Sequence, residues 1–326
     1  ILEHSKNLAA DMGIFVRLDW YADETRGPLM GEITTFPHML QPRAFYTPWA
    51  NELVKSTWHD PEGVALKVIR SADCKDDDPI ARVEALLDKG KVDTRLEDFL
   101  PQPSQMQWAI DDNVTFGALH TYVKRFDLAP WGIARGARVG VLVANGVQLG
   151  ALLIATINRY VAVPIGADLP ASLIATQLEQ SEIEALVVVG GSSEAQKARE
   201  IANQFYDMTV IEMTPSRFFA LPALPAEHRV RDAMETTETN HLNDEVLVLR
   251  TSGSTGDAKS VSYTLAKLVR SSALIARSLE LRPDDLGVSM LPLHHIGGIA
   301  SNLFAPTLSS APMRYHQAFD PKAFFD

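Results

Sequence analysis

The chain has 326 residues, and its 30 Lys and Arg against 41 Asp and Glu give a formal net charge of −11. With 46% hydrophobic and 22% charged residues, the composition is typical of a globular protein that buries a sizeable core. The acidic balance argues against nucleic acid as a partner, because contacts to phosphates need clustered Lys and Arg. The one cysteine, Cys74, excludes an intrachain disulfide framework and favours a cytoplasmic location.

The apolar stretches predict no membrane span, and the first residues predict no secretory signal. Residues 139–157 are the most apolar, but Asn145, Gln148 and three glycines interrupt them. The first twelve residues lack a basic start followed by an apolar run. Because the sequence starts without Met and stops abruptly after residue 326, we expect a fragment whose partners include the remaining domains of a longer chain.

The first predicted element is a β-hairpin over residues 14–35. The side chains of FVRLDWY alternate between two faces, and ADETRGP supplies a turn before LMGEITTF. Residues 42–110 are richer in proline and charge, including the run DDDP. We expect that stretch to be mostly connection, with one helix over residues 80–87.

From residue 114 onward, short apolar runs alternate with helical periods. Continuous β-branched runs between helices indicate parallel strands that are covered on both faces. The prediction is an α/β fold of layered, mostly parallel sheets flanked by helices, with the hairpin in front. The predicted strands cover residues 139–143, 162–165, 185–189, 208–213 and 245–249, and the predicted helices cover residues 146–157, 171–180 and 194–204.

The most informative segment is residues 251–261, TSGSTGDAKSV. It follows the strand at 245–249 and precedes a helical apolar period that begins at Leu265, so we expect a loop between a strand and a helix. Glycines let the backbone approach a phosphate, hydroxyl and N–H groups donate to anionic oxygens, and Lys259 adds positive charge. The predicted cofactor-binding residues are Thr251, Ser252, Gly253, Ser254, Thr255, Gly256 and Lys259.

A flexible Ser/Gly linker is the alternative for this loop. A linker needs neither a buried strand before it nor a lysine and an amphipathic helix after it, so the flanks favour phosphate binding. The loop does not match G-x-x-x-x-G-K-[ST], because Lys259 lies three positions after Gly256 and follows Ala258.

The loop resembles the phosphate loop of the adenylate-forming superfamily, which includes acyl-CoA synthetases, luciferases and peptide-synthetase adenylation domains. The family pattern is roughly T-S-G-[ST]-T-G-x-P-K-G-V. Here Ala258 replaces its proline, and Ser260 replaces the glycine that directly precedes its final valine. Residues 137–171 and the stretch LPLHHIGGI at 291–299 are also similar to the family. The resemblance covers about residues 45–326. It implies a lead-in over residues 43–110 and a truncated AMP-binding domain over residues 111–326.

The implied reaction is the attack of a small-molecule carboxylic acid on ATP, which gives an acyl-adenylate and pyrophosphate, followed by thioester formation with coenzyme A. The resemblance assigns Lys259 to the pyrophosphate charge, Thr251 to Mg²⁺ and His295 to the substrate carboxylate, so Lys259 and His295 are the expected catalytic residues. The role of His294 stays open. Taken alone, a His-His doublet is more often a structural pair.

Several motifs that the family uses further along the chain do not occur here. These are a Tyr-Gly-x-Thr-Glu core, a ribose-binding aspartate, a hinge and a lysine of a small C-terminal domain. None of them follows Gly298, so we expect that this chain alone does not complete adenylation.

Residues 1–42 resemble a different family, the C-terminal end of ATP-grasp proteins of the polysaccharide-biosynthesis type. If the hairpin pairs symmetrically about its turn, Asp19 faces the neighbourhood of Glu32, and two such carboxylates suit a Mg²⁺-nucleotide. The alternative is a solvated polar face that cross-strand pairing stabilises.

Three other readings of the whole chain remain. It could be an ATP-grasp ligase with a non-catalytic adenylate-forming-like extension, a peptide-synthetase-type adenylation domain, or a regulatory remnant without catalysis. The stretch at 291–299 favours an acyl-CoA synthetase over a peptide-synthetase domain. Nucleotide binding that depends on the loop at 251–259 would distinguish the leading hypothesis from an ATP-grasp ligase.

Overall fold

The computed structural model describes residues 17–23, 27–34, 78–91, 93–102, 104–202, 208–214, 239–250, 259–289 and 291–317, the first two segments by their backbone alone. The chain divides into two compact units, residues 1–75 and residues 76–326.

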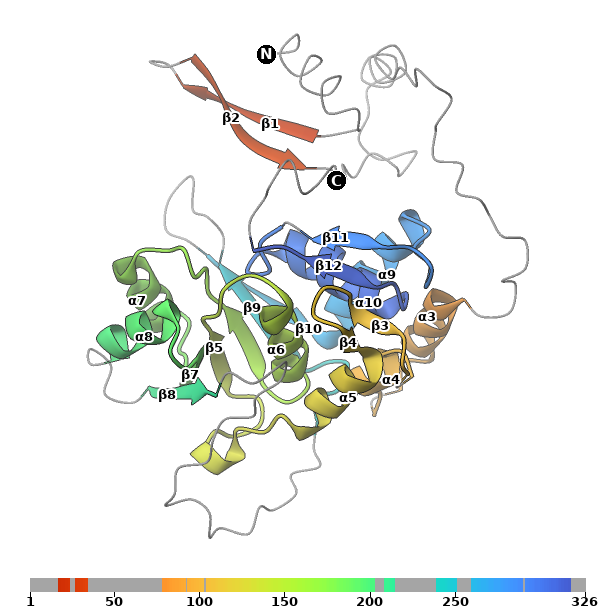
Figure 1. Ribbon diagram of the computed structural model, residues 1–326, viewed down its shortest axis with the longest axis horizontal. Coiled ribbons are helices and arrows are strands. Elements are labelled where there is room, and N and C mark those ends of the chain that lie inside the picture. The colour runs from red at the N-terminus through yellow and green to blue at the C-terminus, as the bar shows by residue number, and fades with distance from the viewer. Residues whose placement is uncertain are drawn as a thin grey trace. The chain divides into compact units, whose positions relative to one another are not determined.

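The described part of the first unit is a two-stranded antiparallel hairpin (Figure 1). Strand β1, Arg17–Asp23, pairs with β2, Gly27–Thr34, and the register places Asp19 opposite Glu32. The predicted hairpin and the predicted pairing of these two residues are therefore confirmed for the backbone.

A six-stranded sheet forms the centre of the second unit, with the strand order β10-β9-β6-β5-β7-β8. Five neighbouring strands are parallel and β10 runs antiparallel to β9 at the edge, which confirms the predicted mostly parallel α/β fold. The strands are β5 Arg138–Val141, β6 Val161–Pro164, β7 Ala185–Val189, β8 Thr209–Met213, β9 Glu245–Arg250 and β10 Ser260–Thr264.

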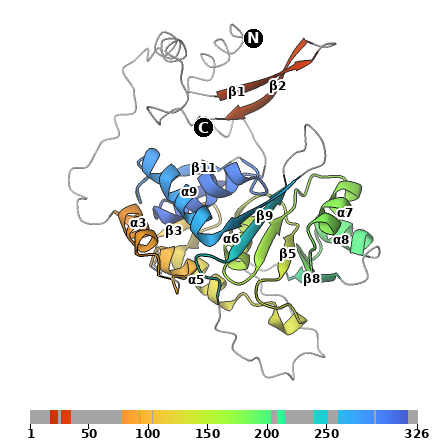
Figure 2. The same cartoon turned by 180° about the vertical axis from the view of Figure 1, so that it is seen from behind.

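Helices cover both faces of this sheet (Figures 1 and 2). Because side chains alternate along a strand, Ala185 and Val187 of β7 join the main core, whereas Leu186 and Val188 join a second core beneath α7 and α8. The nearly fully buried helix α6 packs on β5 and β6 within the main core. The helices are α6 Val147–Ile157, α7 Ala171–Gln180, α8 Ser193–Ala202 and α9 Leu265–Ser278.

A second sheet of four short strands has the order β11-β12-β3-β4, in which only β4 is antiparallel to its neighbour. Its strands are β3 Gln107–Ala109, β4 Val114–Thr115, β11 Gly287–Ser289 and β12 Met313–Tyr315. The remaining helices are α3 Pro79–Lys89, α4 Leu96–Phe99, α5 Phe116–Arg125, the 3₁₀ helix η2 Ala129–Trp131, the π-helix η4 Gly298–Phe304 and α10 Ala305–Leu308.

Residues 78–109 belong to this folded unit, although the sequence suggested mostly connection there. Helix α3 buries Ile80, Val83 and Leu87 in the main core, and Trp108 of β3 is fully buried. The indole N–H of Trp108 donates to the Thr307 hydroxyl at 2.9 Å, a partner far along the chain. Such long-range burial leaves no local periodicity, which explains why the sequence pattern did not indicate it.

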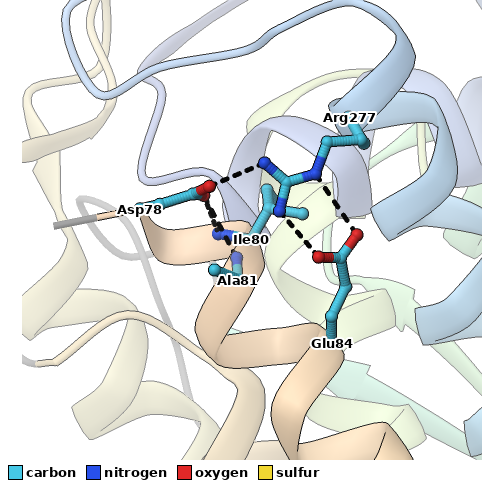
Figure 3. Close-up of polar contacts among 5 residues, drawn as sticks. All are labelled: Asp78, Ile80, Ala81, Glu84 and Arg277. Atoms are coloured by element: carbon cyan, nitrogen blue, oxygen red, sulfur yellow. Dashed lines mark hydrogen bonds and ion pairs between the residues drawn. The ribbon is translucent and has the colours of Figure 1, made fainter. Parts of the chain in front are cut away.

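Arg277 of α9 holds the first turns of α3 in place (Figure 3). Its guanidinium donates to both carboxylate oxygens of Glu84, at 3.2 and 2.7 Å, and to Oδ2 of Asp78 at 2.6 Å. The other oxygen of Asp78 accepts from the N–H groups of Ile80 and Ala81 and so caps α3. The guanidinium of Arg277 therefore binds both the capping residue of α3, Asp78, and the carboxylate of Glu84 further along the same helix.

We expect Arg277→Ala to lower the free energy of unfolding by about 1 kcal/mol, because the pairs are partly exposed but form a network. Urea denaturation followed by circular dichroism measures it. Arg314→Ala is the matched control, since Arg314 is similarly exposed and has a single ion pair with Asp111 at 3.1 Å. That control should cost less than about 0.5 kcal/mol. If both variants lost the same free energy of unfolding, the network around Arg277 would add nothing beyond a single ion pair.

Among the helices in the described part of the chain, none is both long enough and apolar enough to cross a membrane.

Candidate functional site

The carboxyl ends of the two sheets meet at the side chain of Asn145, which follows β5. Its amide oxygen accepts from the N–H of Leu293 at 2.9 Å. Its amide nitrogen donates to the carbonyl oxygens of His316 at 3.1 Å and of Leu291 at 3.4 Å. Since residues 291–293 follow β11 and His316 follows β12, one side chain joins three strand ends from both sheets.

His294 lies against the turn that follows β6. A Cβ atom added to Gly166 in this turn would lie 3.2 Å from Nε2 of His294 and 3.0 Å from Oδ1 of Asp168. A side chain at position 166 would force the imidazole to move, so glycine permits this close approach. The turn after β6 and the loop after β11 therefore lie side by side.

The imidazole rings of His294 and His295 are neighbours with different environments. Their centroids are 4.2 Å apart, His294 is half-buried and His295 is exposed. Burial lowers the pKa of His294 from 6.5 to about 4; the nearby His295 acts in the same direction, and Asp168 opposes both. His294 is therefore neutral at pH 7, with one ring nitrogen as a donor and the other as an acceptor.

The glycine-containing turn expected after the histidine pair is present. A Cβ atom on Gly298 would overlap the carbonyl oxygen of Pro292, so the chain can turn this tightly only with glycine there. The N–H of Ile299 donates to the carbonyl of His295 at 3.0 Å, and the π-helix η4 begins at Gly298. π-Helical turns are rare and occur frequently at functional sites.

The predicted phosphate loop follows β9 at the same edge of the sheet. Thr251, Ser252, Gly253, Ser254, Thr255 and Gly256 lie outside the described residues, so the structure adds nothing on their arrangement. Strand β9 is parallel to β6, with Leu247 opposite Ala162. Its carboxyl end, from which the loop leaves, therefore lies on the same side as the turn that contacts His294.

The expectation that this loop leads directly into a helix is wrong. Residues Ser260–Thr264 form β10, which pairs antiparallel with β9 and places Ser260 opposite Arg250. Helix α9 begins only at Leu265, where the hydroxyl of Thr264 accepts from the N–H of Lys267. The run SVSYT alternates in a strand period and ends on a cap, so β10 separates the predicted loop from helix α9 along the chain.

Lys259 is exposed and lies directly before β10. At the base of the loop, Nη1 of Arg250 donates to the hydroxyl of Ser260 at 3.4 Å. The structure thus places the charged end of the predicted loop at the carboxyl edge of the sheet.

The described residues do not test the predicted metal ligands. Thr251 is undescribed, and of Asp19 and Glu32 only the paired backbone is described. Within the described segments, no group of three or more His, Cys, Asp or Glu residues could hold a metal ion. A metal-binding role for these three residues stays a prediction.

Sequence reasoning missed Asn145, Gly166 and His316 as parts of this edge. The signal for Asn145 was present, because a polar residue directly after an apolar strand often marks the carboxyl edge of a parallel sheet. Gly166 and His316 had no such signal. Their importance follows from contacts between segments far apart in the sequence.

This arrangement defines a class: an α/β domain that gathers its loops at the carboxyl ends of parallel strands, where such folds bind their ligands. The sequence of residues 104–326 matches the AMP-binding enzyme family. Because the match covers more than half of the chain, the chain belongs to this family. The resemblance to the adenylate-forming superfamily is thereby confirmed, and it does not extend to the ATP-grasp-like residues 1–42.

Two curated relatives are CoA ligases. The sulfoacetate–CoA ligase of Cupriavidus necator is 30% identical over 215 residues, which are 65% of this chain and 41% of that ligase. The malonate–CoA ligase of Arabidopsis thaliana is 25% identical over 218 residues, which are 64% of this chain and 33% of that ligase. The chain thus spans less than half the length of these relatives.

Solved structures share the fold. Apo MatB from Rhodopseudomonas palustris has a TM-score of 0.58 at 20% sequence identity, covering 76% of this chain and 47% of MatB. The o-succinylbenzoate CoA synthetase MenE from Bacillus subtilis, in complex with ATP and magnesium, has a TM-score of 0.52 at 20% identity, covering 65% of this chain and 53% of MenE. At these identities the likeness shows the fold alone.

We expect Asn145→Asp to lower the free energy of unfolding by about 2 kcal/mol. A carboxylate keeps the acceptor for Leu293 but places negative oxygens against two carbonyl groups that now receive a hydrogen bond. Urea denaturation at pH 7 measures the loss.

Asn113→Asp is the matched control, because the side-chain contact of Asn113 uses its oxygen alone, which accepts from Gln107 at 2.9 Å. That variant should stay within about 0.5 kcal/mol of the unmodified chain. If Asn145→Asp were equally harmless, the side chain would not anchor the strand ends.

The lowered pKa of His294 makes stability depend on pH. Between pH 6.5 and about pH 4 the unfolded chain holds a proton on this residue and the folded chain does not, so stability falls as pH falls through this window. In the unmodified chain, His294 should lower the free energy of unfolding by about 2 kcal/mol between pH 7 and pH 4.5, and His294→Phe should remove this decrease. Urea denaturation at pH 7 and pH 4.5 measures it.

His295→Phe, at the exposed neighbour, should keep most of the pH dependence. An NMR titration in which the His294 ring signals move near pH 6.5 rather than near pH 4 would refute the assignment.

Proposed function

We propose that this chain is the nucleotide- and acyl-binding part of an AMP-forming acid–CoA ligase. The whole protein would activate a carboxylic acid with ATP as an acyl-adenylate and then transfer the acyl group to coenzyme A. The observation that carries the proposal is the sequence TSGSTGDAKSV at the carboxyl end of β9, on the sheet edge where the histidine pair lies. The CoA ligases among the relatives support it.

In this proposal, residues 251–259 bind the phosphates of ATP and the histidine pair binds the carboxylate of the acid. The N–H and hydroxyl groups of residues 251–256 hold the triphosphate, and Lys259 stabilises the charge that develops on the departing pyrophosphate. His295 is exposed beside the reacting carboxylate, and the neutral His294 orients it by ring contact. These groups position and neutralise the reactants, and none of them forms a covalent bond to the acid.

The substrate class that we propose is a short acid with a second anionic group. Sulfoacetate, malonate and oxalate, which the names of three relatives specify, all have this chemistry. The proposed acceptor is coenzyme A rather than a carrier protein, because the relatives are CoA ligases.

Mg²⁺ belongs to the proposal as the ion that accompanies ATP. The hydroxyl of Thr251, at the start of the loop, is the group that would hold it beside the phosphates, and the bound ion would supply further neutralisation of their charge. A role for Asp19 and Glu32 in a separate nucleotide site stays a prediction that rests on the ATP-grasp resemblance.

The domain boundaries at residues 42 and 110, the cytoplasmic location and the inability of this chain alone to complete adenylation also stay predictions. The chain spans 41% of the sulfoacetate ligase and 33% of the malonate ligase. Activity, substrate and partners are therefore proposed for the whole protein.

Nucleotide binding to the 326-residue chain tests the proposal, with isothermal titration calorimetry of ATP as the measurement. Lys259→Ala should weaken binding about tenfold, because it removes one cation from the phosphates. Gly256→Val should abolish binding, since a branched side chain blocks the backbone from the phosphates. Lys267→Ala, at an exposed lysine on α9, is the control and should leave the affinity unchanged.

Unchanged affinity in both loop variants would overturn the proposal. Affinity that is lost in the double variant Asp19→Ala, Glu32→Ala but kept in the loop variants would favour the ATP-grasp alternative instead. A chain that binds no ATP would favour the regulatory alternative.

A further inference from the structure

His316 has a fixed backbone position directly after β12, next to Asn145. Its N–H donates to the carbonyl of Ser289 at 2.9 Å, and its carbonyl accepts from Asn145 at 3.1 Å. The same Asn145 side chain accepts from Leu293, the residue directly before His294. The backbones of His316 and His294 are therefore held to a common anchor.

The side chain of His316 has an unmet hydrogen-bonding requirement. Its Nε2 atom is buried and has no hydrogen-bond partner among the described residues. Leaving a buried polar atom unpaired costs about 1–3 kcal/mol. The Nε2 atom of His316 is one of nine such side-chain atoms in the described part of the chain, and it is the one on a histidine that Asn145 holds at the candidate site. Neither the hydrogen bonds of the fold nor the roles proposed above for the histidine pair use this nitrogen.

The residue that binds the backbone of His316, Ser289, belongs to a buried polar network. Ser289, whose carbonyl binds the His316 N–H, also accepts at its hydroxyl from Asn302 at 3.4 Å. Asn302 in turn accepts from the hydroxyl of Ser301 at 2.9 Å. Ser289 is fully buried and Asn302 is 7% exposed. A site built beside such a network suits a compact polar ligand better than a long alkyl chain.

We propose that His316 is a specificity-determining residue whose Nε2 hydrogen-bonds the second anionic group of a short diacid. The reacting carboxylate of the same molecule lies beside the pair His294 and His295. This inference rests on the proposed function, deepens its substrate class and assigns the recognition to one atom. Asn145 is the positioning residue, because it holds both ends of the substrate's binding surface at a fixed separation.

The test compares malonate with propionate, an acid of equal carbon chain length that lacks the second carboxylate. Their affinities for the 326-residue chain saturated with ATP are measured by isothermal titration calorimetry. We expect His316→Leu to weaken malonate binding about tenfold, the loss of one hydrogen bond to a charged group, and to change propionate binding less than about twofold.

Two further variants separate recognition from folding. His316→Gln keeps a nitrogen donor at a similar position and should recover most of the preference for malonate. His241→Leu is the matched control, because His241 also has a buried ring nitrogen without a partner among the described residues but precedes β9, at the opposite edge of the sheet. It should leave the ratio of the two affinities unchanged, and thermal melting checks that each variant is folded.

The inference is overturned if folded His316→Leu keeps the preference for malonate over propionate, or if folded His316→Gln does not recover that preference. It is equally overturned if the unmodified chain shows no preference for malonate, or binds neither acid. If ATP binding is retained in those cases, the proposed nucleotide function stands. If ATP binding is also absent, the proposed function fails separately.

Discussion

The hydrogen bonds of Asn145 are the interaction on which the candidate site depends. A primary amide can donate and accept at the same time, so one side chain satisfies the N–H of Leu293 and the carbonyls of Leu291 and His316. These groups follow strands of the second sheet, whereas Asn145 follows β5 of the first. This link is a polar connection between the carboxyl ends of the two sheets.

In the site that we propose, uncharged histidines at the anchored edge recognise the acid, and the predicted phosphate loop supplies the positive charge. Burial keeps His294 neutral, and His316 has a buried nitrogen that no described residue pairs with. In the proposed site, Lys259 and the loop N–H groups provide positive potential for the nucleotide, while the histidines orient the acid. Separating the two tasks avoids burying a full cation next to the core, which would carry a large desolvation penalty.

Local patterns predicted the elements that bury continuous apolar runs. Residues 171–180 and 185–189 form the expected helix and strand, and the hairpin register pairs Asp19 with Glu32 as expected. Strand β10 was missed because its five residues are largely exposed and a strong helical period follows directly. The segment at 78–109 was underestimated because its short elements are buried through distant partners such as Thr307.

By itself, the sequence determined the α/β class, the composition of the predicted phosphate loop and the family. Each of these can be recognised from the residue pattern of a contiguous segment. Only the tertiary structure decided which histidine of the pair is more buried, that Gly166 lies close to His294, and that Asn145 holds the backbones of Leu293 and His316. The physical reason is that these features are hydrogen bonds and close contacts between segments more than one hundred residues apart. Chain folding brings such groups together, and no local period reports it.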